Sequence, residues 1–107
     1  MANKDKCRVI FYAKTDWATP DGLYLCGVTH TSGSWQPESA WKMTPTDKGW
    51  KAIKYLDEGE EFEFKILRGR SWHEVEKGFW NEEIPNHHIK ADHSMVVEMY
   101  IPTFRLD

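Results

Sequence analysis

The sequence predicts an all-β fold, a Greek-key antiparallel β-sandwich of about seven or eight short strands, on three observations. Short segments of alternating polar and apolar residues recur along the chain. Clusters of Gly, Pro, Asp and Ser separate these segments as turns. No segment has helical periodicity over three turns. With 107 residues the chain has the length of one domain, and we expect residues 1–107 to form it.

The predicted strands of the N-terminal half begin with residues 6–14, which alternate apolar and polar side chains. After a turn at 19–22, the run 23–28 is apolar almost throughout, which is typical of a strand covered on both faces. Segments 41–43 and 50–56 flank a stretch rich in Thr, Pro, Asp and Gly, and this pattern predicts a hairpin.

The C-terminal half contains the clearest alternation, at residues 61–66, which predicts a strand with Lys65 on its solvent face. Residues 71–77 predict a short strand with a bulge or bend. Residues 79–93 predict a long loop with one short strand, and 94–101 predict the last strand. Six side chains are predicted to be buried between the two sheets: Phe11, Leu25, Trp50, Phe62, Phe64 and Val97.

The composition narrows the class of function. The net charge is only -3, so neither a nucleic-acid partner nor a membrane surface is expected. Six Trp, four Tyr and five Phe exceed what one small core needs, and this surplus indicates an exposed aromatic binding face. No apolar leader or membrane-length segment is present, which favours the cytosol, or secretion if the chain is part of a larger protein.

Cys7 and Cys26 have no CxxC pattern and are expected to be buried thiols, although a disulfide is conceivable if their strands are adjacent. Four residues with metal-binding chemistry lie close in sequence: His87, His88, Asp92 and His93. Because neighbouring residues of a strand point to opposite faces, His87 and His88 do not readily share one ion. We expect a solvated loop here, no metal site and no other cofactor.

A series of blocks resembles one family. The blocks are residues 22–27 (Gly-Leu-Tyr-Leu-Cys-Gly), 33–35 (Gly-Ser-Trp), Trp50 at the start of a strand, 59–66 (Gly-Glu-Glu-Phe-Glu-Phe-Lys-Ile) and 84–86 (Ile-Pro-Asn). Their order and spacing resemble the starch-binding domains of carbohydrate-binding module family 20 over roughly residues 8 to 100. The resemblance implies an immunoglobulin-like sandwich that binds α-glucan (starch, glycogen or maltooligosaccharide) and is not an enzyme itself. It also implies that a glycan-active enzyme is linked to the module or associated with it.

The resemblance also implies site residues. The family's Trp in the Gly-x-Trp loop, Lys on the Phe-x-Phe-Lys strand and Asn in the Pro-Asn turn correspond to Trp35, Lys65 and Asn86. A second family Trp precedes the Pro-Asn turn by about five residues. Trp80 lies six residues before Asn86, whereas Trp72 lies fourteen residues before it. The resemblance therefore implies that Trp80 is the second carbohydrate-binding Trp. Residues 68–76 depart from the fungal members of the family, which affects ligand preference more than fold.

These residue types suit a sugar ligand. An indole covers the apolar face of a pyranose ring, with a gain of the same order as the ~1–3 kcal/mol of base stacking on aromatic side chains. Two indoles set at an angle match a curved α-1,4-linked chain, whereas flat cellulose would need a coplanar row. A lysine and an asparagine then donate hydrogen bonds to sugar hydroxyls.

Each site residue also has a purely structural explanation. Trp35 can fold over the end of the sandwich, Trp80 can plug it together with Phe79, Lys65 can be solvated, and Asn86 can cap its turn. A protein-interaction sandwich that has lost sugar binding is therefore the alternative function. A glycosidase is disfavoured because the carboxylates lie in turns and on wet faces. We expect a monomer.

The remaining tryptophans are assigned mainly to the interior. Trp41 and Trp72 are expected to pack, as is Trp50. Trp17 and Tyr24 are candidates for a second glucan site, for which the sequence supplies no geometry.

Overall fold

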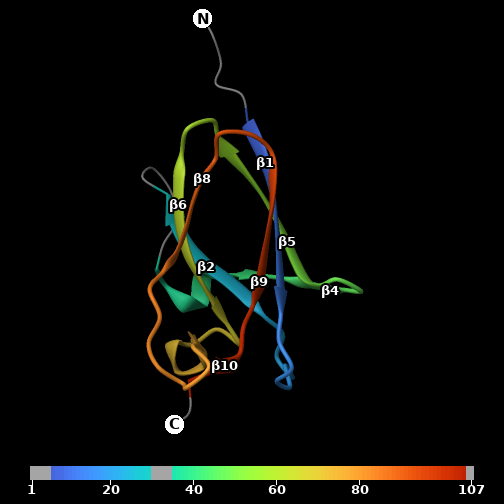
Figure 1. The fold of residues 1–107 in the computed structure, drawn as a ribbon, viewed down its shortest axis with the longest axis vertical. Helices are drawn as coiled ribbons and strands as arrows, with labels where there is room; N and C mark the ends of the chain where they lie inside the picture. Colours follow the sequence, from blue (N-terminus) through green and yellow to red (C-terminus); the bar gives the residue numbers. More distant parts are fainter. Residues whose placement is uncertain (1–5, 30–34, 106–107) are drawn as a thin grey trace, which may run out of the picture.

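The computed structural model describes residues 6–29 and 35–105, and this part of the chain is all-β without an α-helix. Eight strands form two four-stranded sheets that face each other, which confirms the predicted sandwich (Figure 1). With a further short pair, β7 and β10, the described residues contain ten strands. They are β1 (Lys6–Lys14), β2 (Tyr24–Thr29), β3 (Trp41–Lys42), β4 (Thr44–Thr46), β5 (Gly49–Asp57), β6 (Glu61–Leu67), β7 (Glu76–Lys77), β8 (His87–Lys90), β9 (Met95–Tyr100) and β10 (Thr103–Phe104). Two short 3₁₀ helices, η1 (Pro37–Ser39) and η2 (Trp72–Glu74), interrupt the connections.

The first sheet has the strand order β4-β5-β1-β9. β1 pairs antiparallel with β5 along its length and parallel with β9. This parallel pair departs from the prediction of purely antiparallel sheets. It is possible because the whole domain separates β1 from β9 in the chain, so no short hairpin has to join them.

The second sheet is antiparallel and has the order β3-β2-β6-β8. Gly27 lets β2 lie close to β6, because a Cβ at this position would stand 2.5 Å from the carbonyl oxygen of Glu63. β7 and β10 form a small separate pair. That pair and η2 lie at one end of the sandwich, opposite the turn that joins β5 to β6 (Figure 1).

The main core lies between the two sheets and is centred on three phenylalanines. The Phe11 ring contacts Phe64 edge to face, with centroids 5.0 Å apart, and Phe62 stacks on Phe64 at 5.3 Å. The predicted burial of these three rings and of Leu25 is confirmed.

Two of the predicted core residues, Trp50 and Val97, are only half-buried against the core. Trp50 lies against Gly22, which has no side chain to cover the indole. Val97 belongs to β9, an edge strand with a neighbour on one side. The alternation therefore identified the correct face, and the position within the sheet sets the degree of burial.

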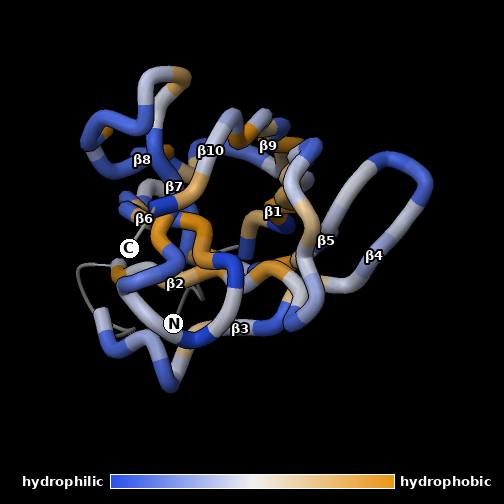
Figure 2. Tube along the Cα trace, turned by 90° about the horizontal axis from the view of Figure 1, so that it is seen from below, coloured by the Kyte–Doolittle hydropathy of each residue, from blue (hydrophilic) through white to orange (hydrophobic). Residues whose placement is uncertain are grey.

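The predicted hairpin between segments 41–43 and 50–56 is wrong. β3 pairs with β2 in the second sheet, and β4, which lies in the predicted turn, forms the hairpin with β5 in the first sheet. The buried side chain of Met43 anchors the chain where it passes from one sheet to the other. The β4–β5 hairpin projects from the sandwich with a hydrophilic tip (Figures 1 and 2).

The segment predicted as a bent strand at 71–77 contains η2, which the Ser71 hydroxyl caps by accepting a hydrogen bond from the His73 backbone N–H at 3.1 Å. Cys7 and Cys26 are buried in different sheets, and no disulfide joins them. Within the described ranges, no helix has the length and apolar character needed to cross a membrane.

Candidate functional site

Three of the four predicted site residues line one cavity of about 340 Å³ near the end of the sandwich that carries η2. Its lining consists of Trp35, Lys65, Trp72, Val75, Glu83, Asn86 and Arg105. The fourth predicted residue, Trp80, does not line it.

Trp72 takes the place in the cavity that was predicted for Trp80. The rings of Trp35 and Trp72 have centroids 6.2 Å apart and planes inclined by 40°. Both indoles are half-buried and pack on a small hydrophobic cluster. The buried members of this cluster are Tyr24, Cys26, Ala40, Leu67 and Val75. The two rings therefore form a tilted aromatic surface with a fixed base.

The chain places Trp72 there through the segment between β6 and β7. Leu67 and Val75 form an isolated bridge, and the backbone N–H of Arg68 donates to the Glu74 carbonyl at 2.9 Å. The Arg68 side chain also pairs with the Glu74 carboxylate at 2.8 Å. These contacts hold residues 68–74 as a short closed loop, in which Trp72 is the first residue of η2.

Trp72 lines this cavity, and the sequence analysis did not include it among the candidate site residues. The assignment of Trp72 mainly to packing is partly correct, because its indole rests on the cluster around Val75. The number of residues from Asn86 favoured Trp80. The cavity, however, is lined by residues from several separate segments, so separation along the chain does not predict which Trp lies in it. Residues 68–76, which differ from the fungal members of the family, could have indicated Trp72. This segment carries a Trp just after the strand that bears Lys65.

Lys65 is buried, with only 7% of its surface exposed, which corrects its predicted place on a wet face. Its ammonium donates a hydrogen bond to the backbone carbonyl of Ile84. Burial lowers the pKa of Lys65, and the nearby carboxylates Glu76 and Glu83 oppose the shift. Lys65 therefore ties β6 to the segment that leads to Asn86.

Asn86 is exposed at the edge of the cavity, just before β8. Within the described residues its side-chain amide has no hydrogen-bond partner, so both its donor and its acceptor face solvent. The amide is thus suited to a polar ligand that lies on the two indoles.

Glu83 and Arg105 supply charge at the rim of the cavity. The Glu83 carboxylate accepts a hydrogen bond from the Lys77 ammonium, and this bond, more than any other contact, lowers the pKa of Glu83. Glu83 is therefore held as a carboxylate and acts as an acceptor.

Trp80 lies outside the cavity, on the loop between β7 and β8, with 90% of its surface exposed. The structure therefore excludes the structural alternative in which Trp80 and Phe79 plug the sandwich, because both are exposed. A sugar-binding role for Trp80 stays a prediction.

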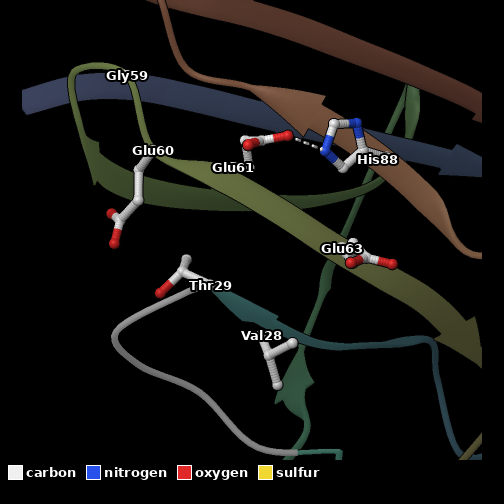
Figure 3. A pocket seen from close by; sticks show the side chains of 7 residues that line it. All are labelled: Val28, Thr29, Gly59, Glu60, Glu61, Glu63 and His88. Atoms are coloured by element: carbon white, nitrogen blue, oxygen red, sulfur yellow. Dashed lines mark hydrogen bonds and ion pairs between the residues drawn. The ribbon is translucent and has the colours of Figure 1, made fainter.

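A larger hollow of about 650 Å³ lies elsewhere, around the β5–β6 turn and the edge of β8 (Figure 3). Its lining is dominated by Glu60, Glu61 and Glu63, and His88 reaches Glu61 at 2.7 Å. Among the described residues, no aromatic ring besides that imidazole lines it, so these residues offer no surface for stacking.

The histidines of β8 point to opposite faces, as predicted. His87 hydrogen-bonds to the buried Glu76 at 2.8 Å and stacks on Phe64, whereas His88 pairs with Glu61 on the outside. Within the described part of the chain, no three His, Cys, Asp or Glu side chains gather as metal ligands.

Comparison with known proteins identifies the family of the chain. The sequence matches the starch binding domain family (CBM_20) over residues 6–99. The chain therefore belongs to the starch-binding domain family, whose ligands are starch and related α-glucans.

Among its relatives are amylopullulanases of Thermoanaerobacterium thermosulfurigenes, 40% identical over 71% of this chain, and of Thermoanaerobacter thermohydrosulfuricus, 33% identical over 84%. A chloroplastic ribonuclease E/G-like protein of Arabidopsis thaliana is 35% identical over 60% of it. The chain spans only 4%, 6% and 7% of the lengths of these proteins, in that order.

Two solved structures share the fold. A glycoside hydrolase family 15 glucoamylase from Hypocrea jecorina superimposes with a TM-score of 0.64 at 16% identity, over 98% of this chain and 18% of its own. The γ-CGTase of an alkalophilic Bacillus clarkii superimposes with a TM-score of 0.57 at 20% identity, over 96% and 15%. This domain therefore resembles a small part of each much larger enzyme.

Proposed function

We propose that this chain is a noncatalytic module that binds α-glucan, including starch, glycogen and maltooligosaccharide, by stacking sugar rings on Trp35 and Trp72. The observation that carries the proposal is the 40° tilt between these two indoles in a cavity that Asn86 also lines. A curved α-linked chain presents successive sugar faces at an angle, which a tilted pair of rings can cover together.

The polar groups of the cavity suit the rim of such a sugar. The Asn86 amide can donate and accept, the Glu83 carboxylate accepts, and the Arg105 guanidinium donates. Lys65 contributes by holding the Ile84 carbonyl, and thereby the segment that precedes Asn86.

The charges of the cavity favour binding over catalysis. Among the described residues that line it, Glu83 is the one carboxylate, and Lys77 lowers the pKa of Glu83. A general acid in a glycosidase needs a raised pKa and a second carboxylate across the scissile bond. Since the relatives are much longer proteins, we propose that the module holds an attached or associated glycan-active enzyme on its polymer.

The test is a titration with maltoheptaose or β-cyclodextrin followed by tryptophan fluorescence and amide shifts. The wild-type domain should show saturable changes, and Trp35→Ala should weaken binding by about 1–3 kcal/mol, the stacking scale. Trp72→Phe should weaken it less than Trp72→Ala, because a smaller aromatic face remains. Pull-down with granular starch and glycogen extends the test to polymers.

Tyr55→Ala is the matched control, because it removes an exposed aromatic ring from the outer face of the first sheet. It should leave binding unchanged. Absence of binding to every α-glucan and β-glucan tested would contradict the proposal and favour a protein-interaction domain.

A further inference from the structure

The tip of the β7–β8 connection, residues 78–82, is a small closed loop. The Gly78 backbone N–H donates to the Glu82 carbonyl at 3.0 Å, and the Asn81 backbone N–H donates to the Gly78 carbonyl at 3.0 Å. Asn81 adopts the left-handed conformation with φ 61°. A Cβ on Gly78 would meet the side-chain carboxylate of Glu82, which accepts a hydrogen bond from the Trp80 backbone N–H at 2.9 Å and so folds back over the loop.

Side-chain contacts attach this loop to β10. The Asn81 amide donates to the Thr103 hydroxyl at 3.0 Å and to the Phe104 carbonyl at 2.7 Å. The Thr103 hydroxyl in turn donates to the Gly78 carbonyl at 2.7 Å. The loop is therefore held in one conformation by the body of the domain.

This fixed loop holds large aromatic side chains in solvent. Trp80 is 90% exposed and Phe79 is 72% exposed. The Phe79 ring stacks beside the exposed ring of Tyr100, with centroids 6.2 Å apart and planes inclined by 29°. Since a free apolar surface is unfavourable in water, a fixed group of exposed rings indicates a ligand surface.

The polar groups beside these rings suit hydroxyls. Asp16 accepts a hydrogen bond from the Tyr100 phenol at 2.8 Å, and Lys14 is the cross-strand partner of Tyr100. Sugar hydroxyls can donate to the Asp16 carboxylate while its charge stays hydrated. A protein partner would have to desolvate this carboxylate, and three side chains fall far short of the ~1,000 Å² that a specific protein interface needs.

The loop continues directly from the cavity described above. Glu83 lines that cavity and lies three residues from Trp80, so their Cα atoms are at most about 10 Å apart. A polymer bound on Trp35 and Trp72 can therefore extend past Glu83 to Trp80.

We propose that Trp80, together with Phe79 and Tyr100, forms a second stacking surface that binds sugar units of the same α-glucan chain beyond those held in the Trp35–Trp72 cavity. The proposal rests on the function proposed above and deepens it. The module then distinguishes glucans by length, because a long chain engages both surfaces and a short one engages only the cavity.

The experiment compares maltotriose with soluble amylose as ligands for the wild type and Trp80→Ala. We expect Trp80→Ala to keep the maltotriose dissociation constant within about twofold and to weaken amylose binding about fivefold or more, which is the lower end of the stacking scale. Trp80→Phe should keep most of the amylose affinity. In the wild type, amylose but not maltotriose should protect Trp80 from acrylamide quenching, measured as the difference from Trp80→Ala.

Tyr55→Ala serves again as the control for loss of an exposed ring and should leave both dissociation constants unchanged. Equal amylose affinity in the wild type and Trp80→Ala would overturn this inference and leave the proposed function standing. Loss of a concentration-dependent dimer in Trp80→Ala, with amylose binding unchanged, would assign the loop to self-association and overturn it as well. Failure of the wild type to bind either sugar would overturn the proposed function itself.

Discussion

Replacement of Phe64 by alanine should remove a large part of the stability of the domain. Phe64 is fully buried and contacts Phe11 at 5.0 Å, Phe62 at 5.3 Å and His87 at 5.1 Å between ring centroids. These rings belong to β1, β6 and β8, so both sheets line the cavity that the substitution leaves. A Phe→Ala change in such a core costs about 3–5 kcal/mol, out of a total of roughly 5–15 kcal/mol for a domain.

Urea unfolding followed by circular dichroism measures this loss as a lower midpoint with an unchanged slope. Thermal unfolding should shift down by at least about 12 °C, from about 4 °C per kcal/mol for a domain of this length. Phe79→Ala is the matched control, because it makes the same change at an exposed position and should cost less than about 0.5 kcal/mol. A loss below about 1 kcal/mol for Phe64→Ala, at an unchanged slope, would refute the placement of this ring at the centre of the core.

Two further predictions concern lysines. Lys65→Met keeps the aliphatic stem but removes the hydrogen bond to the Ile84 carbonyl, so it should lower stability by about 1–2 kcal/mol in urea unfolding and weaken glucan binding as well. A loss of affinity at unchanged stability would instead mark Lys65 as a direct ligand donor. Burial lowers the pKa of Lys54 to about 8, against ~10.4 in an unfolded chain. Between these two pH values the unfolded chain binds more protons than the folded domain does. The free energy of unfolding of the wild type should therefore rise from pH 8 to 10.5 relative to that of Lys54→Met. A difference between the two proteins that does not change with pH would contradict this prediction.

Strand faces could be predicted from the sequence, whereas sheet membership could not. The alternation at 61–66 correctly placed Phe62 and Phe64 in the core because a side-chain period of two is a local property of the strand. The two-residue strand β3 carries almost no such information. Its pairing with β2 depends on the buried Met43 at the crossing between the sheets, a tertiary contact that local turn chemistry does not encode.

The burial of Lys65 also depends on a tertiary contact that the sequence pattern does not predict. It shares the outward face of β6 with Glu61 and Glu63, which are exposed, and this parity predicted a wet lysine. The structure brings Ile84 and Glu76 over the end of that face, so Lys65 alone of the three is covered. Alternation gives the direction of a side chain, but not what the rest of the chain places over it.

Trp72 lines the cavity instead of the predicted Trp80 because of the packing beneath its indole. Trp72 and Trp35 both rest on the hydrophobic cluster around Leu67 and Val75, so the tilt of the aromatic surface is set by packing that also stabilises this end of the fold. Trp80 rests on no such cluster, and hydrogen bonds to β10 hold its loop instead. A change beneath Trp72 therefore acts on stability and on binding together, whereas a change at Trp80 can act on binding alone.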